Sequence, residues 1–165
     1  MALGNNTQQG NKIWLSIYNG KVERSENGQK TQYSYVEGRL VGIYTQERTY
    51  KGERVTKWFI DLQGEQGEAY SIGFPYSSGS LKSIVLALAS DEALTSQNRV
   101  RIEPYLKGEF TNIVVRSNGA KLDWVVRELP AVENVEVGGK TYKDDSKRME
   151  LIASYVEQIN QRLRR

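Results

Sequence analysis

The chain has 165 residues, of which 38% are hydrophobic and 26% are charged, and it carries a net charge of +3. This length and composition are typical of one globular domain with its own core, and the mild basic excess permits an anionic partner without requiring one. The sequence contains no cysteine and no histidine, which excludes disulfides, thiolate metal sites, the usual zinc ligands and any Ser-His or Cys-His catalytic pair.

No segment carries a membrane signal. The N-terminus lacks an apolar signal core, and no apolar run approaches the roughly 20 residues that cross a bilayer. We therefore expect a cytoplasmic protein with no membrane partner.

The first part of the chain predicts a tail, a hairpin and a loop. Residues 1–11 are polar and rich in Gly, Asn and Gln, which is typical of a flexible tail. Residues 12–18 alternate, and Asn19-Gly20 joins them to an extended run over 21–25, the strongest short signal for a β-hairpin. Residues 25–32 are polar and predict a loop. The apolar face of the first strand comprises Ile13, Leu15 and Ile17.

Residues 33–46 predict one long strand that bends. Gly38 and Gly42 inside this alternating segment indicate bulges or sharp bends. Closing a small sheet into a barrel requires such coiling. The alternative is that the two glycines interrupt two shorter strands.

Two strands and a helix follow. In the strand predicted at 55–62, Lys57 and Phe59 lie on the face opposite the expected core residues Trp58, Ile60 and Leu62. Pro75 should end the pairing of the next strand, predicted at 69–76. After a Ser-rich turn that offers an N-cap, helical spacing is shown by Leu81, Ile84, Val85 and Leu88.

The C-terminal half predicts three more strands, a linker and a helix. The strands fall at 99–107, 110–116 and 121–127, and Asn118-Gly119 makes the last hairpin turn. Residues 129–143 predict a linker, and residues 144–165 predict an amphipathic helix capped by Asp144 or Asp145. The apolar stripe of this helix comprises Met149, Ile152, Tyr155, Val156, Ile159 and Leu163.

The fold is therefore expected to be mainly β, with residues 12–128 forming one domain. One helix between the third and fourth main strands of an antiparallel set matches the OB-fold, a five-stranded Greek-key barrel. We expect an OB-like five-stranded antiparallel barrel with an N-terminal β-hairpin, one inter-strand helix and a C-terminal helix. A generic β-sandwich is the competing architecture.

The sequence gives little support to catalysis, and we expect no enzyme, no metal and no cofactor. The carboxylates outside the strands lie in turns and at helix ends, where a solvated charge is the usual role: Glu65, Glu68, Asp91 and Glu92. Val137-Gly-Gly-Lys-Thr141 imitates the end of a phosphate-binding loop but lacks its upstream glycine, so it predicts a tight turn. An Asp/Glu-based nuclease is the one enzymatic hypothesis that we keep.

Basic and aromatic residues together favour binding of single-stranded nucleic acid, because phosphates need cations and bases stack on aromatic rings. They gather on the predicted outer face and on the loops expected at 46–54 and 116–120, which correspond to the ligand-binding loops of OB-folds. The residues predicted to contact nucleic acid are Arg39, Tyr44, Arg48, Tyr50, Lys51, Arg54, Lys57, Phe59, Arg99, Arg101, Tyr105, Arg116, Lys121 and Arg127.

Each of these residues also has an ordinary structural explanation. Tyrosine is common in strands, and outward Lys and Arg on sheet edges discourage aggregation. Phe59 is equally compatible with burial under the C-terminal helix. The functional prediction therefore depends on the cluster rather than on one member.

Four segments carry a resemblance to a known family. They are Lys12–Val22 (KIWLSIYNGKV), Val36–Tyr44 (VEGRLVGIY), Lys57–Leu62 (KWFIDL) and Tyr70–Ser78 (YSIGFPYSS). Together they resemble the single-stranded DNA-binding proteins of phages that infect Bacteroidetes, over about residues 12–128.

The resemblance implies an OB-fold, sequence-tolerant binding of single-stranded DNA, and a role in phage or prophage replication and recombination in a bacterial or phage-infected cell. RNA stays open as a ligand. Many such replication proteins end in an acidic tail that recruits partners, whereas this chain ends in the basic Gln161–Arg165. The C-terminal helix either packs on the barrel or makes an oligomer contact. The second hypothesis is a non-catalytic interaction or assembly module that forms a homo-oligomer through the apolar stripe of this helix.

Overall fold

The computed structural model describes residues 12–165 and is mainly β. The described chain contains β1 (Lys12–Tyr18), β2 (Lys21–Glu26), β3 (Gln29–Tyr33), β4 (Val36–Tyr50), β5 (Glu53–Gln63), β6 (Ala69–Pro75), α2 (Gly79–Ala89), β7 (Arg99–Lys107), β8 (Phe110–Ser117), β9 (Ala120–Lys121), β10 (Glu133–Val137), β11 (Lys140–Asp144) and α3 (Ser146–Leu163). The tail predicted at residues 1–11 lies outside the described residues. Within residues 12–165, neither helix is long and apolar enough to span a bilayer.

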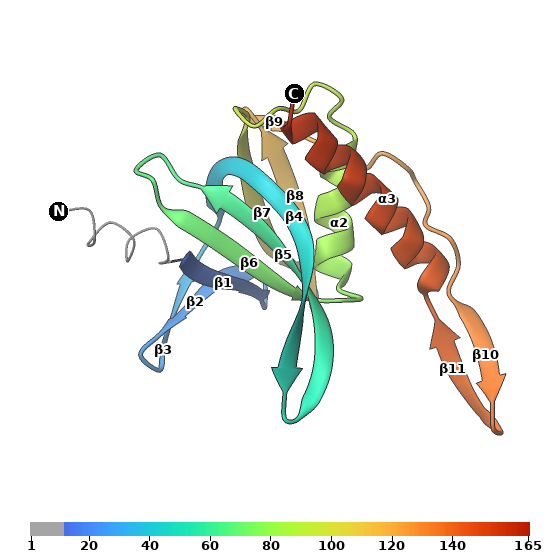
Figure 1. Cartoon of the computed structure of the whole chain (residues 1–165). Helices are drawn as coiled ribbons and strands as arrows, with labels where there is room; N and C mark the ends of the chain where they lie inside the picture. Colours follow the sequence, from blue (N-terminus) through green and yellow to red (C-terminus); the bar gives the residue numbers. More distant parts are fainter. Residues whose placement is uncertain (1–11) are drawn as a thin grey trace.

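Nine strands form one strongly curved sheet in the order β3-β2-β1-β6-β5-β4-β7-β8-β9 (Figure 1). All neighbours are antiparallel except β1 and β6, which pair in parallel. The sheet is not closed by strand pairing, although β2 contacts β7 and the Gly20 amide donates to the Thr111 hydroxyl over 3.1 Å. The five-stranded OB-like barrel therefore stays a prediction.

The hairpin turns follow the sequence signals. Asn19-Gly20 and Asn118-Gly119 have positive φ at both positions, as tight hairpin turns require. Lys51 and Gly52 do the same, with φ of 50° and 80°. As a result, β4 and β5 stay paired as far as Tyr50 and Glu53, and the loop predicted at 46–54 is instead a protruding hairpin with a two-residue turn.

β4 is a single bent strand, so the alternative of two shorter strands is wrong. Its register with β5 shifts between Leu40 and Gly42, which marks the predicted bulge. At Gly38 an added Cβ would lie 2.7 Å from the carbonyl oxygen of Gln63, so this position needs glycine for close backbone approach. The sheet can bend at Gly38 because no side chain there blocks the approach of β5.

Three segments differ from the sequence predictions. The loop expected at 25–32 contains a second tight turn at Asn27-Gly28 and the start of β3. The expected linker contains the β10–β11 hairpin, which projects from the body (Figure 1). The strand expected at 121–127 ends at Lys121, because the Val125 amide donates to the Leu86 carbonyl and draws the chain away from the sheet and onto α2.

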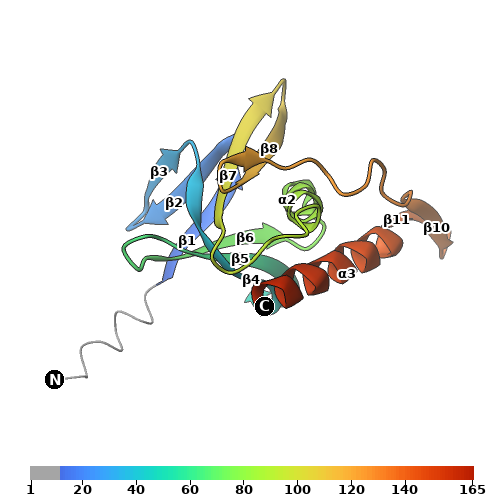
Figure 2. The ribbon, with the colours of Figure 1, turned by 90° about the horizontal axis from the view of Figure 1, so that it is seen from above.

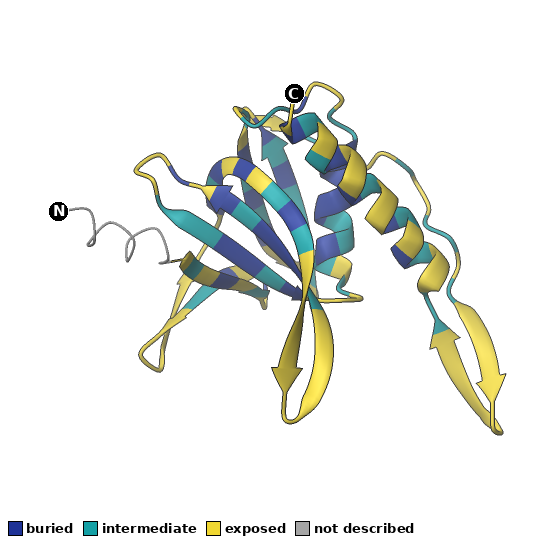
Figure 3. Ribbon diagram, viewed as in Figure 1, coloured by how far each residue is buried: buried dark blue, intermediate teal, exposed yellow. Residues whose placement is uncertain are grey.

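The core lies between the concave side of the sheet and the two helices (Figures 2 and 3). The predicted core residues Trp58, Ile60 and Leu62 are buried there. α2 begins as predicted, with the Ser78 hydroxyl accepting from the Leu81 amide over 3.2 Å. The stripe of α3 is buried against this core, with Tyr155 partly buried.

One of the two aspartates that the sequence offered as caps bonds the beginning of α3 through its side chain. Asp145 occupies the N-cap position but makes no side-chain capping bond. The Asp144 carboxylate accepts from the Ser146 amide over 2.9 Å, and hydrogen bonds from the Ser146 side chain and amide hold the pKa of Asp144 below its usual value.

Helix α3 is anchored to the rest of the chain by polar contacts at its C-terminal end. The Asn160 side chain accepts from the Ile43 amide over 3.1 Å and donates to the Ile43 carbonyl over 2.8 Å, replacing a strand partner where β7 no longer pairs with β4. Arg162 donates to one carbonyl at the end of α2 and to one just after it, and Arg165 donates to two in the loop that follows. The basic C-terminal end is thus partly engaged within the chain.

Candidate nucleic-acid interface

The convex face of β1, β6, β5 and β4 carries an aromatic cluster. Strand pairing places Trp14, Ser71 and Asp61 in one row across this face, and Phe59 and Tyr44 in the next. Side chains of residues that pair directly lie on the same face of a sheet. The parallel contact between β1 and β6 is therefore what brings Trp14 beside Phe59.

Phe59 lies at the centre of this cluster and is only 4% exposed. The Trp14 ring meets it edge-on, with 5.9 Å between centroids, and the Tyr44 ring stacks on it at 5.7 Å. The sequence placed Phe59 correctly on the outer face, opposite the core. Its burial comes from Trp14, Tyr44 and Arg48, not from the C-terminal helix.

Cations lie against these rings. The Arg48 guanidinium is 5.5 Å from the centroid of Trp14 and 5.1 Å from that of Phe59, and the Lys57 ammonium is 6.0 Å from Phe59. At the tip of the β4–β5 hairpin, the Lys51 ammonium is 5.4 Å from the Tyr50 ring. Among residues 12–165, no carboxylate forms an ion pair with Arg48, Lys51 or Lys57, so their charges are free for an anionic ligand.

A polar group borders the cluster. The Lys12 ammonium lies 3.1 Å from both the Tyr44 hydroxyl and an Asp61 oxygen, and the Tyr44 hydroxyl donates to Asp61 over 3.0 Å. The hydrogen bond to Tyr44 is the largest cause that raises the pKa of Lys12 above its usual value. These contacts fix the Tyr44 ring in its stacked position on Phe59.

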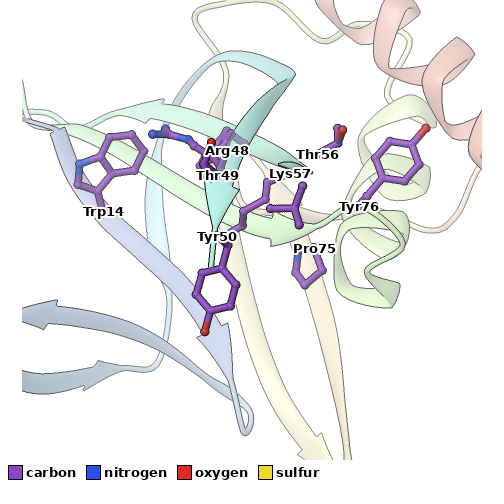
Figure 4. A pocket seen from close by; sticks show the side chains of 10 residues that line it. Trp14, Arg48, Thr49, Tyr50, Thr56, Lys57, Pro75 and Tyr76 are labelled. Atoms are coloured by element: carbon purple, nitrogen blue, oxygen red, sulfur yellow. The ribbon is translucent and has the colours of Figure 1, made fainter. Parts of the chain in front are cut away.

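An open pocket of about 780 Å³ adjoins the cluster along the hairpin (Figure 4). Trp14 and Tyr76 lie at opposite ends of it, and Tyr50 extends from the hairpin between them (Figure 4). Tyr76 is held by stacking on Trp58 at 6.0 Å. The pocket is lined by Trp14, Arg48, Thr49, Tyr50, Val55, Thr56, Lys57, Phe59, Pro75 and Tyr76.

The structure brings together six of the residues predicted to contact nucleic acid: Tyr44, Arg48, Tyr50, Lys51, Lys57 and Phe59. Arg54 is on the same hairpin but pairs with Thr49, on the opposite face from Arg48. Its guanidinium lies 3.6 Å from the Glu47 carboxylate. Arg54 does not line the pocket, and its charge is already paired.

Four predicted arginines lie elsewhere, at the far end of β4 and on β7 and β8. Glu37 accepts from Arg101 over 2.7 Å and lies 3.6 Å from Arg99, which also pairs with Glu65. Glu103 lies 3.3 Å from Arg116, and Arg39 contacts Gln97. The loop expected at 116–120 borders this network and not the pocket. Three of the four, Arg99, Arg101 and Arg116, are thus already paired with carboxylates.

The last three predicted residues, Tyr105, Lys121 and Arg127, are exposed but do not line the pocket. Conversely, sequence reasoning missed Lys12, Trp14 and Tyr76. The alternation of β1 does place Lys12 and Trp14 opposite its apolar face, which is a usable signal. Nothing local indicated that this face would lie beside that of β5.

The arrangement is suited to binding a ligand that carries both flat rings and negative charge. Within the described part of the chain, no group of three Asp or Glu residues is placed to hold a metal ion. Exposed ring faces and free cations side by side are the features that hold nucleotides without reading their sequence. Comparison with protein-family models, with curated proteins and with solved structures finds no match to this chain.

Proposed function

We propose that the protein is a sequence-tolerant single-stranded DNA-binding protein that acts in phage-type replication or recombination, in the cytoplasm of a bacterial or phage-infected cell. The observation that carries the proposal is the pocket along the β4–β5 hairpin, where Arg48 and Lys57 lie against aromatic rings and pair with no carboxylate of residues 12–165. The resemblance of four sequence segments to phage single-stranded DNA-binding proteins supports the biological setting.

The energetics of the pocket fit this ligand. A base stacked on an aromatic side chain contributes about 1–3 kcal/mol, whichever base it is. Trp14 is 48% exposed and Tyr50 is 64% exposed, so both rings offer accessible surface. Arg48 lies next to the Trp14 ring, Lys51 next to the Tyr50 ring and Lys57 next to the Phe59 ring. These cations would neutralise the phosphates that join stacked bases.

The strand order supports an OB-like domain as the finer description of the fold. β4, β5 and β6 form an antiparallel meander, α2 follows, and β7 pairs with both β4 and β8. OB-folds bind oligonucleotides on their second and third strands and the loop between the first two. In this description, β5, β6 and the β4–β5 hairpin occupy those positions, and they line the pocket.

The alternative, a module that assembles through its C-terminal helix, has less support. Met149, Ile152, Val156, Ile159 and Leu163 are buried within the chain, so the stripe is occupied by intramolecular packing. Assembly through this helix would have to use its outer, polar side.

The test is a titration with oligo-dT at several salt concentrations, followed by tryptophan fluorescence. For single strands, log K falls with log salt with a slope of about −0.7 per phosphate neutralised, so the three cations Arg48, Lys51 and Lys57 together predict a slope of about −2. The same titration with oligo-U compares RNA. Absence of binding to either polymer at low salt would overturn the proposal.

A further inference from the structure

We propose that Arg48 makes binding depend on an unpaired base as well as on a phosphate. In the free protein its guanidinium covers Trp14 and Phe59; in the complex it leaves these rings for a phosphate, and a base takes its place. The inference rests on the proposed function, because it names the residue that separates single strands from other polyanions.

The first support is the position of Arg48. Its guanidinium lies within 5.5 Å of the ring centroids of both Trp14 and Phe59. Phe59 is 4% exposed, so a base cannot reach its ring while the neighbouring groups stay in place. Of the groups that cover Phe59, Tyr44 is held by Asp61 and Trp14 belongs to a paired strand, whereas Arg48 is held by ring contacts alone among the described residues.

The second support is the freedom of Arg48 to move. It is exposed on the part of β4 that protrudes from the sheet, and no carboxylate among the described residues ties its guanidinium down. A long, flexible side chain at this place can turn from the rings to the mouth of the pocket without any change of backbone.

Selectivity follows from the exchange. A single strand supplies a phosphate for Arg48 and a base for the vacated ring faces, and a stacked base is worth more than a cation at an exposed ring. A duplex, or a polyanion without bases, supplies only the phosphate or sulfate. When Arg48 turns to such a ligand, no base covers the ring faces that it leaves. The lost cation–π contact is then not replaced, and the binding of such ligands stays weak.

Lys51 provides a matched control. It lies on the same hairpin and carries the same charge, but its ammonium contacts the Tyr50 ring and covers neither Trp14 nor Phe59. Arg48→Ala and Lys51→Ala should each remove one phosphate contact and reduce the salt slope for oligo-dT by about 0.7. Only Arg48→Ala also uncovers a stacking place.

The experiment compares the two variants with the wild-type protein over a range of salt. Lys51→Ala should bind more weakly than wild type until high salt. Arg48→Ala should bind more weakly than wild type at low salt. At high salt it should bind about twofold to fivefold more tightly, because it has no exposed cation–π contact to break and that contact is worth this factor in affinity. If the plot of log K against log salt for Arg48→Ala never crosses the wild-type plot, the inference is overturned. Failure of the wild-type protein to bind overturns the proposed function instead.

A second measurement follows the side chain directly. Ring currents from Trp14 and Phe59 should shift the Arg48 side-chain protons upfield in the NMR spectrum of the free wild-type protein. Oligo-dT should abolish this shift, and an abasic oligonucleotide of the same length should leave it. A shift that survives oligo-dT, or that disappears with the abasic strand, contradicts the exchange.

Discussion

Tyr50 gives the sharpest test of the pocket, because its ring is available for binding and unimportant for folding. It is 64% exposed at the end of the β4–β5 hairpin, and its ring contacts the Lys51 ammonium at 5.4 Å. Substitution of such a residue changes the free energy of unfolding by about 0.5 kcal/mol or less. Loss of one stacked base costs about 1–3 kcal/mol, so Tyr50→Ala should weaken binding of oligo-dT about 5-fold to 150-fold.

The assay is the oligo-dT titration at low salt, with urea denaturation of the same samples to confirm an unchanged fold. Tyr142→Ala is the matched control, because Tyr142 is 53% exposed on the separate β10–β11 hairpin. The control should bind like wild type. Equal affinity of Tyr50→Ala and wild type, or an equal loss in both variants, would refute the assignment of the pocket.

Three further predictions concern stability. Phe59→Ala should lower the free energy of unfolding by about 3 kcal/mol, as for other buried phenylalanines, and urea denaturation should show most of this stability retained in Phe59→Leu. Arg162→Ala should cost about 1–3 kcal/mol by leaving carbonyls at the end of α2 without their charged donor, whereas Arg164→Ala, which removes an exposed side chain, should leave the thermal midpoint unchanged. The pKa of Asp144 is lowered in the folded protein, so its contribution to the free energy of unfolding is complete above the unfolded pKa of 3.8 and is lost as pH falls through the folded pKa. In that acidic range the thermal midpoint of Asp144→Asn should therefore fall less steeply with pH than that of the wild-type protein.

The parts of the fold that the sequence predicted are those that local patterns determine. Alternation along residues 55–62 separates Trp58, Ile60 and Leu62 from Lys57 and Phe59 because neighbouring side chains in a strand point to opposite faces. Asn-Gly turns fix hairpins for an equally local reason, since both residues tolerate positive φ. The buried stripe of α3 follows from helical periodicity alone.

The parts that the sequence did not predict depend on contacts between distant segments. No local pattern indicates that β1 pairs in parallel with β6, yet this pairing places Trp14 over Phe59. The sequence likewise did not show that Arg101 and Arg116 form ion pairs, because Glu37 and Glu103 become their neighbours only once β4, β7 and β8 align. The β10–β11 hairpin is exposed along almost its whole length, so burial imposes no alternation on its sequence.

The contact between Asn160 and Ile43 has a consequence for synthesis of the protein. The two residues are 117 positions apart, and the side-chain amide completes the backbone bonding of β4 next to its bulge. A ribosome therefore finishes β4, β5 and β6 long before the group that satisfies Ile43 leaves the exit tunnel. During that interval the amide and the carbonyl of Ile43 lack their hydrogen-bond partner on α3.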